Sequence, residues 1–290
     1  MSNAERLREL LSKPGLVAMP GVFDAISARL AQQAGFEAAF MSGFCVSAAR
    51  LGLPDTGLIS YTEMVDQARN ICDAISIPVI GDGDTGWGNA INIRRTVDGF
   101  ARAGCACIMI EDQLSPKKCG HVRGKQIVGR DEAFSRIQAA VDARFEGADI
   151  LIMARTDANA TNGLDEAIER CQEFRRIGAD ITFLEAPVDI DQMTRYCNEV
   201  DGPKMANMVE QGDTPYLSPK ELYSMGYKVA IWPAAAMLAA IKAMQEVLQR
   251  LKAGEVSEDN KITFSELRNI VGFPHYYEME KKYIPTSDEA

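Results

Sequence analysis

Short runs of apolar residues alternate with longer amphipathic stretches along most of the chain. In the long stretches, apolar positions recur every three to four residues, which is the periodicity of a helix with one buried face. Most of these stretches begin at Asp, Ser, Thr or Asn and end near Gly, as helices do. Strands are predicted at Leu16–Met19, Glu37–Met41, Pro78–Ile80, Ala106–Ile110, Ile150–Ala154, Ile181–Leu184, Lys204–Ala206 and Lys228–Ile231. The predicted helices include Asp24–Gln33, Thr62–Ala74, Ala90–Ala103, Asp131–Ala143, Leu164–Ile177 and Pro219–Met225.

Repeated strand–helix alternation predicts an α/β fold with one continuous parallel sheet, a (β/α)₈ TIM barrel. Barrels of this class commonly fill a chain of this length, 290 residues, as a single domain. A doubly wound open sheet is the alternative that the same alternation allows.

Polar and charged residues follow six of the predicted strands. They are Ser42 and Gly43, Asp82 and Asp84, Glu111 and Asp112, Arg155 and Asp157, Glu185, and Asn207 with Glu210. Chemistry in a (β/α)₈ barrel lies at the C-terminal ends of the strands, so these side chains are expected to share one rim. Loop residues are generally polar, which is the competing explanation for any single position. Several neighbouring carboxylates repel one another unless a cation neutralises them, and Mg²⁺ prefers oxygen ligands.

The stretch Gly81–Gly86, GDGDTG, also satisfies the G-x-G-x-x-G pattern of a dinucleotide-binding turn. Its two aspartates argue against that function, because carboxylates beside a pyrophosphate oppose the attraction of the backbone N–H groups. The same carboxylates on a glycine-rich backbone suit a hard divalent cation.

The overall composition limits the classes of partner. A net charge of −10 argues against nucleic acid and anionic membranes, which need a basic surface, but leaves small anionic substrates open. The N-terminus has no signal-peptide core, and the apolar run Val229–Ile241 is short and interrupted by Pro233. Seven cysteines without a C-x-x-C pair are expected to be reduced thiols. We therefore expect a soluble, cytoplasmic protein.

A second candidate stretch, EDQLSPKKCGHVRGK at 111–125, concentrates cations around Cys119 in an otherwise acidic chain. Neighbouring Lys and His residues lower the pKa of a thiol, which makes Cys119 a candidate acid/base. Gly120 suits a loop that closes over a bound anion. A solvated basic loop with an incidental cysteine is the alternative interpretation.

The KKCGH segment, the preceding EDQ and the upstream DGDTGWGN together resemble the isocitrate lyase and phosphoenolpyruvate mutase superfamily. Further matching motifs are PGVFDAISA (20–28), MSG (41–43), LGLPD (51–55), ARTDA (154–158), FLEAP (183–187) and NMVEQGDTP (207–215). The resemblance implies one barrel domain over residues 1–290 with its eighth helix exchanged between subunits, in a homotetramer built as a dimer of dimers. The tail after about residue 254, with amphipathic Phe264–Ile270 and Tyr276–Lys282, is expected to form a helical extension at the subunit interface.

The resemblance also implies the ligands of a Mg²⁺ ion, with Mn²⁺ as the alternative metal. Asp82 is expected to bind the metal directly, and Asp55, Asp84 and Glu111 through water. A small anionic dicarboxylate is expected to be held by the following residues: Ser42, Gly43, Phe44, Gly120, Arg155 and Asn207.

The KKCGH segment favours the carbon–carbon lyases of the superfamily, and LGLPD and NMVEQGDTP favour the 2-alkylmalate lyases, such as 2,3-dimethylmalate lyase and petal death protein. Cleavage of a substituted malate leaves a carbanion that needs a positioned acid, expected to be Cys119, with His121 and Glu185 tuning or relaying its proton. Alternative activities are methylisocitrate lyase, oxaloacetate hydrolase or decarboxylase, and carboxyphosphonoenolpyruvate or phosphoenolpyruvate mutase. Pro233 argues against the hydrolase, whose members tend to have a serine there. A barrel that binds dicarboxylates without turnover is a further alternative.

Overall fold

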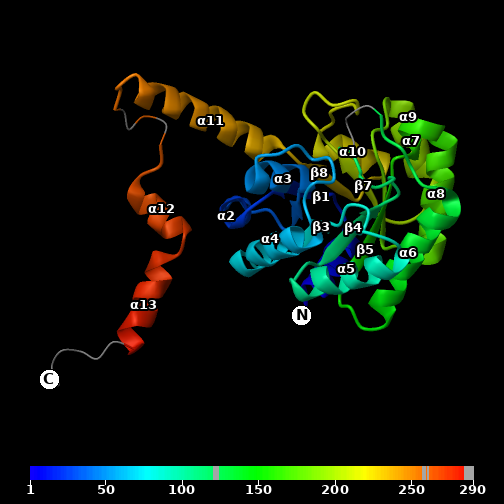
Figure 1. Ribbon diagram of the computed structural model, residues 1–290, viewed down its shortest axis with the longest axis horizontal. Helices are drawn as coiled ribbons and strands as arrows, with labels where there is room; N and C mark the ends of the chain where they lie inside the picture. Colours follow the sequence, from blue (N-terminus) through cyan, green and yellow to red (C-terminus); the bar gives the residue numbers. More distant parts are fainter. Residues whose placement is uncertain (120–123, 257–258, 260, 284–290) are drawn as a thin grey trace. The chain divides into compact units, whose positions relative to one another are not determined.

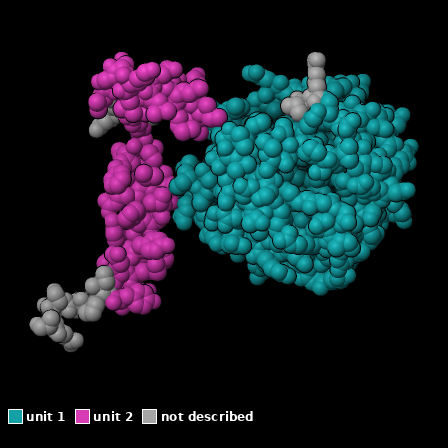
Figure 2. All heavy atoms as spheres, viewed as in Figure 1, with its two compact units in different colours: residues 1–238 teal, residues 239–290 magenta. Residues whose placement is uncertain are grey.

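The computed structural model describes residues 1–119, 124–256, 259 and 261–283. The chain forms two compact units, Met1–Leu238 and Ala239–Ala290, coloured separately in Figure 2. The boundary between the units lies within helix α11 (Ala235–Lys252).

The first unit is a closed barrel of eight parallel strands surrounded by helices (Figure 1). The strands are β1 (Val17–Val22), β2 (Ala39–Met41), β3 (Val79–Asp82), β4 (Cys107–Glu111), β5 (Leu151–Thr156), β6 (Ile181–Leu184), β7 (Lys204–Asn207) and β8 (Val229–Trp232). β1 pairs with β8 in parallel, with Val17 opposite Val229, and this pairing closes the sheet. The predicted (β/α)₈ barrel is therefore confirmed, and the open-sheet alternative is wrong.

Helix α1 (Asn3–Ser12) precedes β1, and the other helices of the first unit follow the strands in the expected order. They are α2 (Ala25–Gln33), α3 (Gly43–Leu51), α4 (Tyr61–Ala74), α5 (Ala90–Arg102), α6 (Arg130–Phe145), α7 (Ala158–Asn162), α8 (Leu164–Ile177), α9 (Ile190–Glu199) and α10 (Pro219–Met225). The second unit contains most of α11, then α12 (Phe264–Ile270) and α13 (Phe273–Tyr283). Every helix in the described part of the chain is too short or too polar to span a bilayer.

Alternate residues of each strand fill the inside of the barrel, as the two-residue period of a strand requires. One buried cluster collects such residues from all eight strands, among them Met19, Phe40, Ile80, Met109, Met153, Phe183, Met205 and Ile231. Leu7 of α1 joins the same cluster at 0% exposure. A second and a third cluster lie between the strands and the surrounding helices.

The close approach of β1 and β8 explains why position 21 is a glycine. A Cβ atom on Gly21 would lie 2.0 Å from the carbonyl oxygen of Pro233. Only glycine therefore lets β1 run this close to the residue that follows β8.

Candidate active site

The candidate site continues the inward-facing rows of the strands at their C-terminal ends. In six of the eight strands a polar residue comes two positions beyond a buried inward one. The pairs are Phe40 and Ser42, Ile80 and Asp82, Met109 and Glu111, Met153 and Arg155, Phe183 and Glu185, and Met205 and Asn207. The strand period therefore aims these polar side chains into the mouth of the barrel. Their common position follows from secondary structure and needs no special loop.

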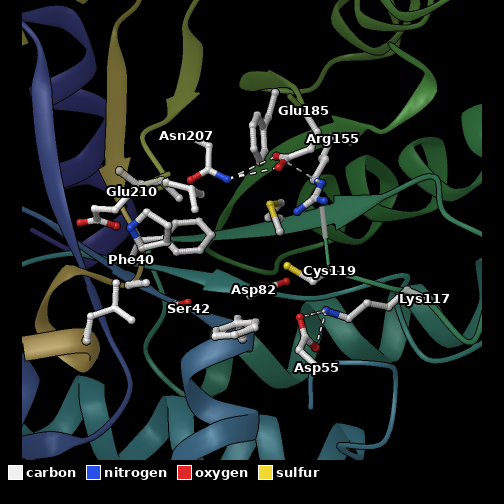
Figure 3. A pocket seen from close by; sticks show the side chains of 18 residues that line it. Phe40, Ser42, Asp55, Asp82, Lys117, Cys119, Arg155, Glu185, Asn207 and Glu210 are labelled. Carbon is white, nitrogen blue, oxygen red and sulfur yellow. Dashed lines mark hydrogen bonds and ion pairs between the residues drawn. The ribbon is translucent and has the colours of Figure 1, made fainter. Parts of the chain in front are cut away.

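Of these polar residues, all but Glu111 line a cavity of about 320 Å³, drawn in Figure 3. Its polar lining is Ser42, Asp55, Asp82, Lys117, Cys119, Arg155, Glu185, Asn207 and Glu210. Its apolar lining is Phe40, Phe44, Met109, Phe183, Val209, Ile231, Pro233, Ala234 and Leu238. Most residues that the sequence assigned to substrate or metal thus meet in one place.

Asp82 is fixed by backbone donors from two segments. Its Oδ2 accepts a hydrogen bond from the Gly43 amide at 3.1 Å, and its Oδ1 accepts one from the Asp84 amide at 3.1 Å. A Cβ atom on Gly43 would lie 2.5 Å from Asp82 Oδ2, so glycine permits this contact. The Gly43 amide, expected from the sequence to meet substrate, therefore already serves Asp82. Ser42 caps α3, because its hydroxyl accepts from the Cys45 amide at 3.4 Å.

Lys117 lies between two of the acids expected at the metal. Its Nζ donates to Asp55 Oδ2 at 2.7 Å and forms an ion pair with Asp84 Oδ1 at 2.8 Å. Burial alone would lower the pKa of Lys117, but the carboxylates of Asp84, Asp82, Glu111 and Asp55 raise it well above its usual range. Burial raises the pKa of Asp84 to about 7, although Lys117 acts in the opposite direction. Asp84 has a φ of 46°, a conformation that a non-glycine residue adopts at a cost.

The four acids fit Mg²⁺ by their chemistry. Asp82 faces the cavity, and Glu111 Oε1 is buried without a hydrogen-bond donor from the described residues. Burial raises the pKa of Glu111 well above its ordinary value, against the attraction of Arg155, and such a group gains from a cation. In the part of the chain that the structure describes, no three acidic, His or Cys side chains form a ready-made metal cage. Mg²⁺ needs only one or two direct carboxylates because it keeps several waters, so this open arrangement suits it.

Arg155 is clamped by a neighbouring aspartate on the other side of the cavity. Its Nε and Nη2 donate to the two carboxylate oxygens of Asp157 at 2.9 and 3.1 Å. Glu111 Oε2 lies 3.3 Å and Glu185 Oε2 3.9 Å from Arg155 Nε. Burial would lower the pKa of Arg155, but these carboxylates raise it well above its usual value. The guanidinium also lies over the ring of Phe183, 5.2 Å from its centroid.

Glu185 is fully buried and lies beside Asn207. The Asn207 Nδ2 group donates to Glu185 Oε1 at 3.3 Å (Figure 3). Glu185 thus contacts both residues that the sequence assigned to carboxylate binding. This position suits either a proton relay or a partner that orients Arg155 and Asn207.

Cys119 lines the cavity, and Figure 3 draws it between Arg155 and the pair formed by Asp55 and Lys117. A second thiol, Cys45, donates to the carbonyl of Pro233 at 3.3 Å, and burial raises its pKa to about 11. Cys45 is therefore a poor proton donor at neutral pH. Gly120 and His121, also assigned to the site, lie outside the described residues.

Several residues of the site were not assigned from the sequence. Lys117 contacts Asp55 across 62 positions, and Lys125 donates to Asp157 across 32 positions. The cation density of 111–125 marked the segment but gave no sign of which acid each lysine meets. Phe40 and Phe183 were also missed, although the two-residue period extended backwards from Ser42 and Glu185 identifies both.

Comparisons with known proteins agree with this architecture. The family model for phosphoenolpyruvate phosphomutase matches residues 7–252. 2,3-Dimethylmalate lyase of Eubacterium barkeri is 44% identical over 286 residues, which cover 98% of this chain and 99% of that protein. The chloroplastic carboxyvinyl-carboxyphosphonate phosphorylmutase of Arabidopsis thaliana is 41% identical over 285 residues, covering 96% of this chain and 84% of that protein.

Solved structures are similar over nearly the whole chain. Oxaloacetate acetylhydrolase in complex with the inhibitor 3,3-difluorooxalacetate superposes with a TM-score of 0.94 at 36% identity, covering 99% of this chain and 98% of that one. A phosphonopyruvate hydrolase complex with oxalate and Mg²⁺ superposes with a TM-score of 0.88 at 27% identity, covering 98% and 100%.

Proposed function

The chain belongs to the phosphoenolpyruvate mutase and isocitrate lyase superfamily of enzymes, and from this premise we propose that it is a Mg²⁺-dependent carbon–carbon lyase that cleaves a 2-alkylmalate such as 2,3-dimethylmalate. The products are a 2-oxo acid such as pyruvate and a short carboxylate. One observation carries the proposal: Cys119 lines the same cavity as Asp82 and Arg155. An acid, a candidate metal ligand and a carboxylate-binding cation thus face one volume.

The proposed metal site consists of Asp82 as the direct ligand, with Asp55, Asp84 and Glu111 holding its waters. When bound, Mg²⁺, or Mn²⁺ in its place, would stabilise negative charge on the oxygen at C2 of the substrate. Gly43 and Asp84 hold Asp82 through their amides, which keeps its carboxylate fixed at the cavity. Lys117 balances part of the charge of the acids.

Arg155 and Asn207 are proposed to bind the carboxylate at C4, with Ser42, Phe44 and Gly120 contributing to the substrate site. As the C2–C3 bond breaks, the C2 hydroxyl gives its proton to the carboxylate of Glu185, which later returns it to the Cys119 thiolate, and C2 becomes a ketone. The electron pair of the bond passes to C3 and its carboxylate. The thiol of Cys119 then delivers a proton to C3, with Glu185 and His121 tuning or relaying that proton.

The apolar lining supports an alkylated substrate. Phe40, Phe44, Phe183, Pro233 and Leu238 offer carbon surface around the polar groups. Methyl or ethyl groups on C2 and C3 of the substrate can be buried against this surface, and no polar group is left unpaired when they are.

The test is NMR detection of 2-oxo acid release from a substrate panel, with Mg²⁺ and with EDTA. The panel comprises malate, 2-methylmalate, 2,3-dimethylmalate, 2-ethyl-3-methylmalate, 2-methylisocitrate and oxaloacetate. We expect a 2-alkylmalate to be cleaved fastest and only with metal. Faster turnover of 2-methylisocitrate or oxaloacetate would replace the proposed substrate class, and no turnover of any compound would refute the lyase.

A phosphonate mutase is the second candidate, favoured by the matched phosphoenolpyruvate phosphomutase model and the Arabidopsis relative. Transfer of a phosphono group delivers no proton to carbon, so a mutase has no need of Cys119. Incubation with phosphonopyruvate and with carboxyphosphonoenolpyruvate, followed by ³¹P NMR, separates the two activities.

We also propose a homotetramer with the helices after the barrel at the subunit interface. Within the second unit, α11 exposes Ile241, Met244, Leu248 and Leu251 by 40–64%, at the spacing of one helix face. Such a face gains free energy when it is covered by another copy. Light scattering of the purified protein measures the assembly, and Leu248→Glu is expected to weaken it.

All seven cysteines are free thiols, which suits the proposed cytoplasmic location.

A further inference from the structure

Lys125 has a buried side chain that the proposed reaction does not use. It lies at the end of the segment that carries Cys119, and its Nζ donates to Asp157 Oδ1 at 2.9 Å. The side chains of Lys125 and Asp157 are 5% and 0% exposed. Burying both the ammonium group of Lys125 and the carboxylate of Asp157 costs desolvation free energy. A role beyond stability is therefore expected of this ion pair.

Asp157 connects Lys125 to the proposed substrate-binding arginine. The same carboxylate accepts both donors of the Arg155 fork, at 2.9 and 3.1 Å. The backbone amide of Asp157 donates to Asp112 Oδ1 at 2.9 Å. The backbone of Asp157 is thus fixed by Asp112, and the carboxylate of Asp157 sets the position of the Arg155 guanidinium.

The charges around Arg155 show what the lysine adds. Asp157, Glu111 and Glu185 all lie within 4 Å of Arg155 Nε. Even with Glu111 assigned to the metal, one guanidinium faces the two carboxylates of Asp157 and Glu185. This negative excess would repel an anionic substrate and hold the guanidinium to its own neighbours. Lys125 offsets one of these negative charges, that of Asp157, with which it forms an ion pair.

We infer that Lys125 is a positioning residue that acts through Asp157 to keep Arg155 available for a substrate carboxylate. The inference rests on the proposed binding role of Arg155. It assigns Lys125 to substrate binding and leaves the proton transfer to Cys119.

The test compares Lys125→Met, Lys125→Arg and the control Lys220→Met. Lys220 is exposed on α10 and does not line the cavity, so its variant removes the same charge elsewhere. Calorimetry measures binding of 3,3-difluorooxaloacetate, a four-carbon dicarboxylate, in the presence of Mg²⁺. We expect binding about tenfold weaker or more in Lys125→Met, the order expected when a buried charge behind a ligand residue is removed. Lys125→Arg and Lys220→Met are expected to stay within about threefold of the wild type.

A double-mutant cycle tests whether Lys125 acts on Arg155 through Asp157. In an Asp157→Asn background, Lys125→Met is expected to weaken binding by less than about twofold, because the charge it balanced is gone. With the substrate found by the panel, KM should rise more than kcat falls. An undiminished effect in the Asp157→Asn background, or wild-type binding by Lys125→Met, would overturn the inference.

Circular dichroism and thermal unfolding establish that each variant is folded. If Lys125→Met does not fold, Lys125→Gln decides, since glutamine still donates to Asp157 but carries no charge and is expected to weaken binding equally. Arg155→Met separates the two proposals. Wild-type affinity in Arg155→Met would refute the role of Arg155 itself, whereas weakened binding there with an unaffected Lys125→Met refutes the inference about Lys125 alone.

Discussion

The two sides of the cavity surround a buried cation with carboxylates in different ways. On the acid side, formed by Asp55, Asp82, Asp84 and Glu111, the cation is Lys117 from the segment after β4. On the arginine side, the cation is Arg155 from strand β5, clamped in bidentate fashion by Asp157. Arg155 lies on a strand and two of its nitrogens are hydrogen-bonded to Asp157, so its guanidinium has one fixed position. The ammonium group of Lys117 is a point charge, and a second cation can share the surrounding carboxylates with it.

The difference indicates a division of tasks. The acid side has more carboxylates than one lysine neutralises, which suits the binding of a further cation. The arginine side fixes a planar donor group, which suits the binding of an anion. Each side therefore predicts a different defect when it is damaged.

The largest effect is expected between the two sides, at Cys119. Cys119→Ala removes the proposed proton donor and should lower turnover by about a thousandfold, within the range of general acid catalysis. Binding of 3,3-difluorooxaloacetate should change little, because neither side of the cavity is altered. Stopped assays of 2-oxo acid release and calorimetry measure the two quantities. Cys72→Ala, a partly buried thiol on α4, is the control, and unchanged 2-oxo acid release in Cys119→Ala would show that another group protonates the carbanion.

Asp82→Asn damages the acid side alone. We expect Mg²⁺ affinity to fall about a hundredfold, because the amide is a neutral and weaker oxygen ligand than the carboxylate. Titration with Mg²⁺ monitored by calorimetry gives the affinity, and Asp66→Asn, a surface acid paired with Arg50, is the matched control. Wild-type Mg²⁺ affinity in Asp82→Asn would place the metal elsewhere.

Arg155→Lys damages the arginine side and keeps a positive charge beside Glu111, whose Oε2 lies 3.3 Å from Arg155 Nε. The charge stays but the fork is lost, so binding of 3,3-difluorooxaloacetate should weaken by about ten- to a hundredfold. Mg²⁺ affinity measured without the dicarboxylate should match the wild type. An equal loss of both affinities would contradict the division between the two sides.

The smallest effect is expected from Gly43→Ala, which acts on the acid side through backbone packing. The new methyl group would lie 2.5 Å from Asp82 Oδ2, so the carboxylate must shift. We expect Mg²⁺ affinity to fall about tenfold and unfolding to cost about 1–3 kcal/mol less. Gly129→Ala is the control, since nothing lies within 4 Å of its added methyl. Unchanged metal binding in Gly43→Ala would show that the Gly43–Asp82 contact does not matter for the metal.

Local patterns in the sequence determined the elements and the rim. Each of the eight predicted strands overlaps an observed one, and β2 differs mainly by starting at Ala39 instead of Glu37. Hydrophobic periodicity encodes such elements within a few residues of chain, so no distant contact is needed to read them. The two-residue period then carries Asp82, Arg155 and Glu185 to the same end of the barrel.

Only the tertiary structure decided which charges meet. The sequence allowed an open sheet until the pairing of β1 with β8 excluded it. The sequence marked the lysines of 111–125 as a group. Only the fold brings Lys117 to Asp55 and Asp84, and Lys125 to Asp157. Ion pairs carry no periodicity, because their partners come from different loops whose distance is set by the closed sheet. The sequence therefore determined the candidate chemistry, and barrel closure determined its connections.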